Sequence, residues 1–304
     1  MFVLKEEIEK FISYCVSNKK LSPKTIKAYS IDLKQFIAFS GNNFNKDCLS
    51  RYIALLHQNY KPKTAKRKIA CLKTFSNHML YEEIIEENPF AKIKTSFKEP
   101  FILPKTIPLE IIRKILSFAY QQLNCAKLTQ YRKKEIIRDI AVLELLFATG
   151  ARVSEICNLR KNNIDLINRF VKIYGKGSRE RIIQIENTEV LQALNTYYHY
   201  FRDDIEDKGY FFINKLRNHL SEQSVRFMIN KYVKKIGYSS HITPHMFRHS
   251  FATLLLEEDV DIRYIQKILG HSSITTTEIY THVSSVKQKE ILATRHPRNK
   301  INLR

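Results

Sequence analysis

Apolar residues recur every three or four positions along most of this 304-residue chain, which contains only seven glycines and eight prolines. Such a period places apolar side chains on one face of a helix, and the scarcity of glycine and proline leaves few points at which a helix must stop. The sequence therefore predicts a mainly helical protein. We expect helices near 3–17, 23–40, 46–58, 62–81, 108–122, 136–148, 188–202, 221–236, 244–258, 261–269 and 274–281.

One segment, RFVKIYGKGSRERIIQI at 169–185, has a different period. Val171 and Ile173 alternate with other residues, GKGS provides a turn, and Ile183 and Ile185 resume the alternation. Alternation on both sides of a glycine-containing turn predicts a β-hairpin. Lys176 would lie at the tip of this hairpin. Together with the helices, the hairpin makes the predicted fold class mainly α with a small β-sheet or hairpin.

Four of the eight prolines fall within the 21 residues from Asn88 to Pro108. Proline resists continuous helix, so this stretch predicts an extended tether. The length of the chain also exceeds the usual size of one domain. We therefore expect an N-terminal helical domain at 1–96, a linker at 97–107 and a second domain at 108–304, with a basic tail at 284–304.

The formal net charge is +21, of which +8 lies in residues 1–100 and +13 in the remainder. A field of this sign attracts polyanions, so both parts of the chain are suited to contact a phosphate backbone. The alternatives are a basic solubilising surface and a membrane-surface protein, but no lipid-binding helix is evident. Composition favours nucleic acid as the partner without distinguishing DNA from RNA.

The five cysteines are odd in number, scattered and without a CxxC pair. This usage favours reduced thiols in a cytoplasmic protein and excludes a zinc ribbon. The first residues, MFVLKEEIEK, do not resemble an export leader, and the apolar segment IAVLELLFATG is interrupted by Glu144. We expect neither export nor a membrane partner.

The segment KPKTAKRK at 61–68 has five basic residues and no acidic one. On a helix that starts at Pro62, apolar residues including Ile69, Leu72, Met79 and Leu80 can face the core while basic residues lie outside that stripe. A solvated charged face is the alternative to phosphate contact. The candidate DNA-binding residues here are Lys63, Lys66, Arg67 and Lys73.

The segment TPHMFRHSFAT at 243–253 predicts a helix that starts at Pro244, with Thr243 available as its cap. His245 and Arg248 are three residues apart, so they share one helix face. A zinc-protease reading of His245 and His249 would need a glutamate between them, whereas an arginine there would repel a metal. The sequence therefore predicts no metal site.

Three further segments offer groups that could reach the same point. Arg152 follows a glycine break in ATGARVSE, with Glu155 close enough to hold it; His271 follows Gly270, which ends a helix; and Tyr280 lies nine residues later. With Lys176, these residues supply the cations, imidazoles and phenol that phosphoryl transfer requires. A tyrosine of ordinary pKa near 10 needs cationic neighbours or a base before it can attack phosphorus.

Four segments resemble, in order, the motif boxes of the tyrosine recombinases, the phage-integrase family: TGARVSEICNL, GKGSRER, TPHMFRHSFATLLLE and LGHSSITTTEIYTHV. The resemblance covers most of 108–304, and the N-terminal helices resemble the SAM-like core-binding domain of that family. It implies that Arg152 and Arg248 activate the phosphate, that Lys176, His245 and His271 assist, and that Tyr280 is the nucleophile. A 3′-phosphotyrosyl link would form and free a 5′-hydroxyl, without a cofactor. Arg179 and Arg181 in the second box are expected to contact DNA.

The 24 residues from Arg152 to Lys176 and the 69 from Lys176 to His245 resemble the compact Xer subgroup. By that resemblance, residues near 284–296 would dock into a neighbouring subunit and form a homo- or hetero-tetramer on two double-stranded DNA sites; a disordered basic tail is the alternative. A second recombinase and a DNA translocase activator are possible partners. Chromosome-dimer resolution and mobile-element integration are not distinguished.

Two other functions fit parts of the pattern. A type IB topoisomerase-like relaxase would use the same six residues without strand exchange, and a sequence-specific DNA-binding protein would retain them without cutting. The intact set of six disfavours the binding protein. The separate basic N-terminal domain, which could clamp DNA, favours the recombinase over the relaxase.

Overall fold

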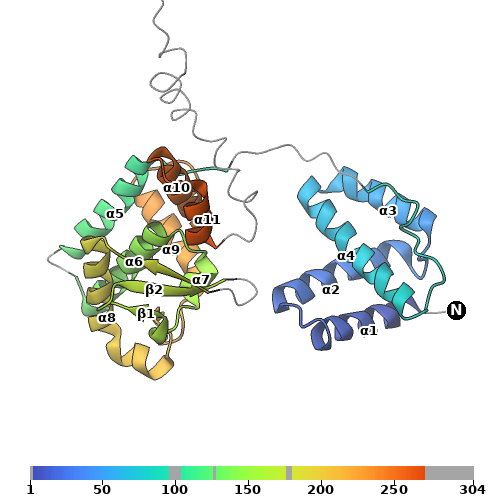
Figure 1. The fold of residues 1–304 in the computed structure, drawn as a ribbon, viewed down its shortest axis with the longest axis horizontal. Coiled ribbons are helices and arrows are strands. Elements are labelled where there is room, and N and C mark those ends of the chain that lie inside the picture. Colours follow the sequence, from blue (N-terminus) through green and yellow to red (C-terminus); the bar gives the residue numbers. More distant parts are fainter. Residues whose placement is uncertain (1–2, 96–103, 126–127, 176–179, 271–304) are drawn as a thin grey trace, which may run out of the picture. The chain divides into compact units, whose positions relative to one another are not determined.

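The computed structural model describes residues 3–95, 104–125, 128–175 and 180–270. The chain is mainly helical and divides into two compact units, 1–101 and 102–304 (Figure 1). Each unit has its own apolar core.

The first unit contains four helices, α1 (Leu4–Ser17), α2 (Pro23–Ser40), α3 (Lys46–Asn59) and α4 (Pro62–Tyr81). Ser22 caps α2 by accepting a hydrogen bond from the Thr25 backbone N–H at 3.2 Å, and Pro23 occupies the first turn. Aromatic pairs such as Phe11 with Phe75 fill the core between the helices. The predicted four-helix bundle is confirmed.

The second unit combines helices with a three-stranded sheet. Its elements, in chain order, are α5 (Leu109–Leu123), α6 (Gln130–Thr149), α7 (Val153–Cys157), the 3₁₀ turn η1 (Lys161–Asn163), β1 (Ile164–Asp165), β2 (Phe170–Tyr174), β3 (Glu180–Gln184), α8 (Thr188–Lys208), α9 (Glu222–Lys235), α10 (Pro244–Glu257) and α11 (Ile262–Leu269).

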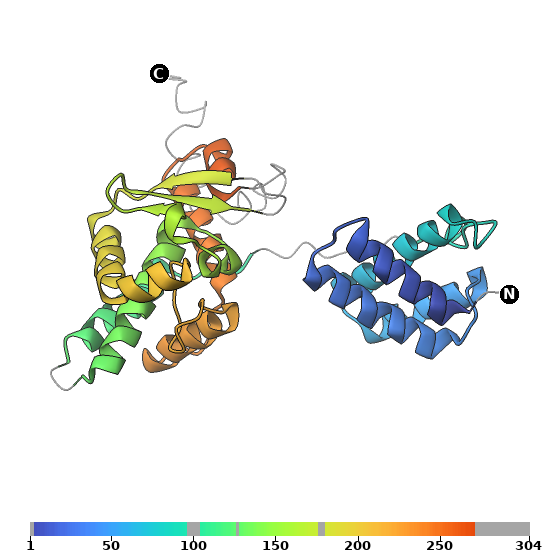
Figure 2. The ribbon, with the colours of Figure 1, turned by 90° about the horizontal axis from the view of Figure 1, so that it is seen from below.

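The sheet is antiparallel with the order β1-β2-β3. Val171 pairs with Ile183 and Ile173 pairs with Arg181, so the predicted hairpin has the expected strands. Figure 2 shows the sheet along one edge of the helical body of this unit. Its turn, 176–179, lies outside the described residues.

Helix α6 is central to the second unit and packs against α5, α7, α8 and α10. It is buried along most of its length, which is why its sequence is apolar on nearly every face after Ile136. Because α6 contacts so many elements, its end at Gly150 is a fixed point from which the next segment starts.

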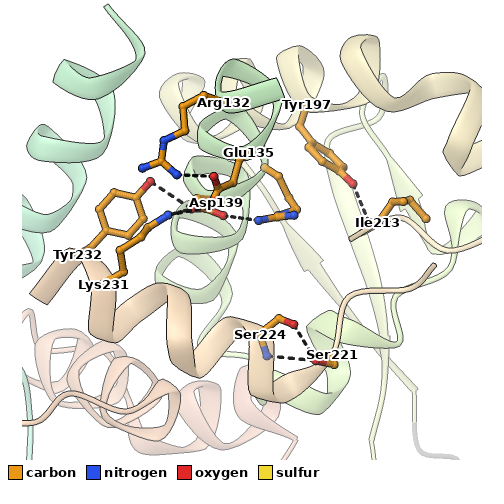
Figure 3. A network of polar contacts seen from close by, with 10 residues as sticks. Arg132, Glu135, Asp139, Tyr197, Ile213, Ser221, Ser224, Lys231 and Tyr232 are labelled. Carbon is orange, nitrogen blue, oxygen red and sulfur yellow. Dashed lines mark hydrogen bonds and ion pairs between the residues drawn. The ribbon is translucent and has the colours of Figure 1, made fainter. Parts of the chain in front are cut away.

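A buried polar network joins α6 to α9 (Figure 3). Asp139 is 1% exposed and accepts hydrogen bonds from Lys231 at 2.7 Å, Tyr232 at 3.3 Å and Arg138 at 2.9 Å. Lys231 also reaches Glu135 at 3.1 Å. Several donors satisfy the oxygens of this buried carboxylate, and the network orients the helices that supply them.

Several boundaries differ from the prediction. Helix α6 begins at Gln130 because Thr129 caps it, although its first turns lack an apolar period, and α8 continues to Lys208, where Gly209 adopts the left-handed conformation that ends it. The short elements α7 and β1 were not predicted, since five and two residues carry no periodic signal.

Two side chains also differ from expectation. Leu80, expected in the core, is exposed, while Ile69, Leu72 and Met79 are buried as predicted. Thr243 precedes α10, but its side chain makes no capping hydrogen bond.

Within the described residues, no helix is both long enough and apolar enough to span a bilayer.

Candidate active site

Arg248 is a charged residue in the interior of the second unit. It lies on α10 and is 4% exposed. Its guanidinium donates hydrogen bonds to the carbonyl of Gly150 at 2.8 Å and to that of Leu269 at 2.7 Å. These bonds offset the cost of burying the charge and tie the ends of α6 and α11 to α10.

Gly150 brings the chain close enough for this contact. Its φ is +57°, and a Cβ there would come within 2.5 Å of the Phe251 side chain and 2.9 Å of Leu269. Only glycine fits both the backbone conformation and the space. The chain therefore turns sharply and presents Arg152 at the start of α7.

Arg152 is held by the side chain of Glu155. The Arg152 backbone N–H donates to Oε2 at 2.8 Å, and its Nη1 donates to Oε1 at 2.9 Å. The Arg152 side chain remains 34% exposed, which leaves part of the guanidinium accessible. The expectation that Glu155 orients Arg152 agrees with this geometry.

His245 lies on α10 one turn before Arg248 and is exposed. Desolvation lowers the pKa of His245, and the positive charges of Arg248, Arg152 and Arg226 lower it further, while Glu222 opposes them. Both arginines of the predicted set therefore act on this imidazole. A lowered pKa favours the neutral imidazole, the form that can accept a proton.

His249 lies on the same helix and is half-buried. Burial lowers its pKa to about 4, with further contributions from His245 and Arg248. The neighbouring Ser250 donates to the carbonyl of Ile107 at 3.1 Å and accepts from its N–H at 2.6 Å. These contacts attach the start of the second unit to the helix that carries Arg248.

Arg181 differs from its predicted role as a DNA contact. Its side chain is 9% exposed, and its guanidinium binds the Glu155 carboxylate and the Ile268 carbonyl. Burial alone would raise the pKa of Glu155, but the hydrogen bonds and charge of Arg181, together with those of Arg152, lower it overall. A guanidinium turned inward in this way favours a structural position over a phosphate contact.

Arg181 also shows what the sequence analysis missed. It lies two residues before Ile183 and four before Ile185, so it shares their inward side of the strand. A charged residue at a position that alternation assigns to the interior was the available signal for a buried partner.

Four predicted residues, Lys176, Arg179, His271 and Tyr280, lie outside the described residues, as does the tail at 284–304. The described chain ends at Gly270, which terminates α11 with φ +65° as expected. Leu269, which precedes it, accepts the hydrogen bond from Arg248. Of the predicted set, the structure brings together Arg152, His245 and Arg248, since the charges of both arginines act on the imidazole.

The basic residues of α4 lie in the other unit. Lys63 and Lys66 are exposed, and Arg67, 45% exposed, forms an ion pair with the buried Asp32. Lys73 donates to Thr95 Oγ1 at 2.5 Å. Lys68, which was not a predicted DNA contact, is buried and bonds to Asp32 at 2.9 Å.

In the part of the chain that the structure describes, no three His, Cys, Asp or Glu side chains gather as a metal site would require. The two arginines make the site cationic, which suits the charge that develops on a phosphodiester.

Comparison with known proteins identifies the class. The model of the phage integrase family matches residues 115–286, and that of the phage integrase N-terminal SAM-like domain matches residues 8–83. The chain belongs to the phage integrase family of tyrosine recombinases, enzymes that cut and rejoin DNA. This confirms the predicted family and fold class.

The relatives place the chain more closely. It is 50% identical over 301 residues to a tyrosine recombinase of Agathobacter rectalis, with 97% of each chain covered. It is 34% identical to XerC of Leptospira interrogans, covering 97% of this chain and 94% of the relative, and 32% identical to XerD of Listeria monocytogenes, covering 96% and 98%. The chain is thus a site-specific recombinase of the Xer type.

Solved structures share the fold. The XerA recombinase matches with a TM-score of 0.55 and 26% identity over 96% of this chain and 99% of that one. XerH bound to its difH substrate matches with a TM-score of 0.75 and 19% identity, covering 94% and 83%. A lambda integrase tetramer on a Holliday junction matches with a TM-score of 0.69 and 17% identity, covering 92% and 77%.

Proposed function

We propose that this recombinase cuts DNA through Tyr280, with Arg152 and Arg248 stabilising the charge on the attacked phosphate. The tyrosine oxygen loses its proton and bonds to phosphorus, the bond to the 5′ oxygen breaks, and that oxygen leaves as a hydroxyl after receiving a proton. A 5′-hydroxyl from a partner strand then attacks the phosphotyrosine and regenerates the tyrosine. The number of phosphodiester bonds is unchanged, so no nucleotide cofactor is required.

The other residues serve proton transfer and charge stabilisation. His245, whose lowered pKa favours the neutral form, can accept a proton or donate a hydrogen bond, and Lys176 in the hairpin turn is proposed as the acid for the leaving oxygen. His271, which follows Gly270 in sequence, completes the set. The predicted contacts of Lys63, Lys66, Arg67, Lys73 and Arg179 with the DNA backbone remain part of this proposal.

The observation that carries the proposal is the attachment of Arg248. A buried guanidinium held by two backbone carbonyls is fixed before DNA binds, and its charge acts on His245 together with that of Arg152. Fixed cations stabilise a developing charge without reorganising during the reaction, which is the largest single contribution in many enzymes.

The cellular setting follows from the same family. We propose that the enzyme works in the cytoplasm as a tetramer on two double-stranded DNA sites, as lambda integrase does on a Holliday junction. The tetramer would consist of identical subunits or include a second recombinase, as the separate names XerC and XerD suggest. A DNA translocase could activate it. Either chromosome-dimer resolution or mobile-element movement would use this chemistry.

The proposal is tested with a nicked half-site duplex from the host genome that cannot be resealed after cutting. The wild-type protein should form a covalent protein–DNA adduct on a denaturing gel, and Tyr280→Phe should form none because the nucleophilic oxygen is absent. Tyr131→Phe is the matched control, since this tyrosine of α6 is 60% exposed and has no assigned role. It should form the adduct at the wild-type rate.

An adduct that persists in Tyr280→Phe would contradict the assignment of the nucleophile. A second measurement uses two full sites with different labels. Exchange of the labels is expected and would exclude a pure relaxase, whereas binding without any adduct would leave only a DNA-binding protein.

A further inference from the structure

Arg181 occupies an interior position of the sheet. It pairs across the hairpin with Ile173, which is buried, and the next residue on the same side of β3 is the buried Ile183. An alternating strand places apolar side chains on this side. Burying an arginine here is favourable only if its N–H groups find partners within the protein.

Those partners are present. Nη2 of Arg181 donates to Oε2 of Glu155 at 2.7 Å and Nη1 to Oε1 at 3.2 Å, so the carboxylate is held by both arms of the guanidinium. The third group, Nε, donates to the carbonyl of Ile268 at 2.7 Å. All three bonds are made within the protein, and the side chain is only 9% exposed.

Each partner belongs to a segment that also holds an arginine of the active site. Glu155 binds the backbone N–H and Nη1 of Arg152 with the same two oxygens that accept from Arg181. Ile268 immediately precedes Leu269, whose carbonyl binds Arg248. One guanidinium therefore connects β3, α7 and the end of α11.

The packing at Gly270 shows how close this connection is. A Cβ on Gly270 would lie 3.1 Å from both Cδ and Nη1 of Arg181. The turn that ends α11 thus rests directly on the Arg181 side chain. Removing that side chain would leave a gap beneath the turn, and Glu155 would lose two of its charge-assisted hydrogen bonds and keep those from Arg152.

We infer that Arg181 is a positioning residue for recombination: it holds Arg152, through Glu155, and the end of α11 at the separation that lets both arginines meet one phosphate. The inference rests on the proposed function of Arg152 and Arg248. It replaces the expected DNA contact of Arg181 with a role inside the protein. Lysine cannot substitute for it, because an ammonium lacks both the fork and the Nε donor.

The test compares Arg181→Met and Arg181→Lys in the full-length protein, with Arg169→Met as the matched control because Arg169 is half exposed at the start of the same hairpin. The rate of adduct formation on the nicked half-site is measured in a single turnover at saturating DNA, and affinity by fluorescence anisotropy on the same duplex.

We expect affinity to change less than about threefold, and the rate to fall roughly 100-fold in the methionine variant, as for a displacement of about 1 Å. The lysine variant should lose roughly 10-fold and the control nothing.

A pH profile distinguishes positioning from a general loss of structure. Without Arg181, Glu155 keeps the burial that raises its pKa but loses the partner that lowers it most. It should then take up a proton as the pH falls through the weakly acidic range, and the ratio of wild-type to variant rate should rise there. The control uses Glu155→Gln, which cannot titrate. The ratio of its rate to that of the double variant Glu155→Gln/Arg181→Met should not change with pH.

The outcomes separate the two proposals. If the wild-type protein forms no adduct, the proposed function fails. If the wild-type protein forms the adduct, a wild-type rate in Arg181→Met overturns the inference. A loss of DNA affinity above tenfold with the saturating rate retained also overturns it, because a residue that contacts DNA would behave in this way. Thermal melts show whether each variant is folded. If Arg181→Met is not folded, the inference is tested with Arg181→Lys alone, and a wild-type rate of adduct formation in that variant overturns it.

Discussion

Arg248 and Arg181 are both charged, both buried, and both bonded to carbonyls at the end of α11. Their roles differ because of what else they contact. Arg248 lies beside His245 on α10, whereas Arg181 faces Glu155 and the interior. At the scale of single residues, the neighbours of a buried guanidinium distinguish them: the charge of Arg248 acts on His245, whereas Arg181 is paired with a carboxylate.

The neutral His249 should make stability depend on pH. Its pKa is lowered from an ordinary 6.5 to about 4 in the folded protein, so the unfolded chain takes up a proton first as the pH falls. This contribution to stability is complete above about pH 6.5 and is lost as the pH falls toward 4, at no more than about 1.4 kcal/mol for each pH unit. Urea melts between those pH values measure it.

His249→Gln is the control for that experiment, since glutamine does not titrate. Its stability should fall less steeply with decreasing pH than that of the wild-type protein. Equal slopes for the two proteins would contradict the assignment.

Short turns between elements set the geometry of the site. Gly150 ends α6 and Gly270 ends α11, both with positive φ. A Cβ at Gly150 would collide with Phe251, whereas one at Gly270 would only crowd Arg181, and Gly209 ends α8 with φ +68° and open space around it. At the scale of elements, Gly150 is required by packing as well as by backbone conformation, and Gly209 by conformation alone.

This contrast gives a prediction for Gly150→Ala. Backbone strain should cost about 1–2 kcal/mol, as in any left-handed position, and the collision with Phe251 and Leu269 should add about 1–3 kcal/mol of overpacking. Gly209→Ala carries only the strain and is the matched control. Chemical denaturation of both variants measures the difference.

If Gly150→Ala were no less stable than Gly209→Ala, the close approach of α6, α10 and α11 at this turn would be refuted. Gly150→Ala should also lose activity, because the carbonyl that binds Arg248 and the start of the Arg152 segment both move with the turn.

At the scale of the whole molecule, two units with separate cores share an excess of positive charge. Part of that charge is used internally, as in the ion pairs that Asp32 makes with Arg67 and Lys68. Exposed residues of α4 such as Lys63 and Lys66 remain on the surface of the first unit. Binding to DNA should therefore depend strongly on salt, because each phosphate contact releases counterions.

Specifically, log Kd should rise linearly with log salt concentration, and Lys63→Gln should reduce that slope by about 1 if Lys63 contacts one phosphate. Lys10→Gln is the control, since Lys10 is an exposed lysine of α1 that pairs with Glu7. Fluorescence anisotropy between low and moderate salt measures both. Equal slopes for wild-type protein and Lys63→Gln would remove this residue from the interface.

Local sequence was sufficient for most of the fold. The apolar period of α2 and α4, the proline at their first turns and the alternation of β2 and β3 depend on neighbours within a few residues, so these predicted elements are present. The helix predicted at 274–281 lies outside the described residues. It was insufficient for α7 and β1, which are too short to show a period, and for the first turns of α6, whose apolar pattern starts late. Leu80 was misplaced because a wide apolar stripe does not reveal which edge a neighbouring helix covers.

The motifs by themselves identified the family and the residues that could act on a phosphate, since the types of side chain required are fixed by the chemistry. Only the tertiary structure decided which groups each arginine contacts. The sequence gives no distance between residue 155 and residue 181, or between 248 and 269, because these pairs are brought together by packing around α6. That packing turns Arg181 inward, fixes Arg248 on two carbonyls and leaves Arg152 partly exposed.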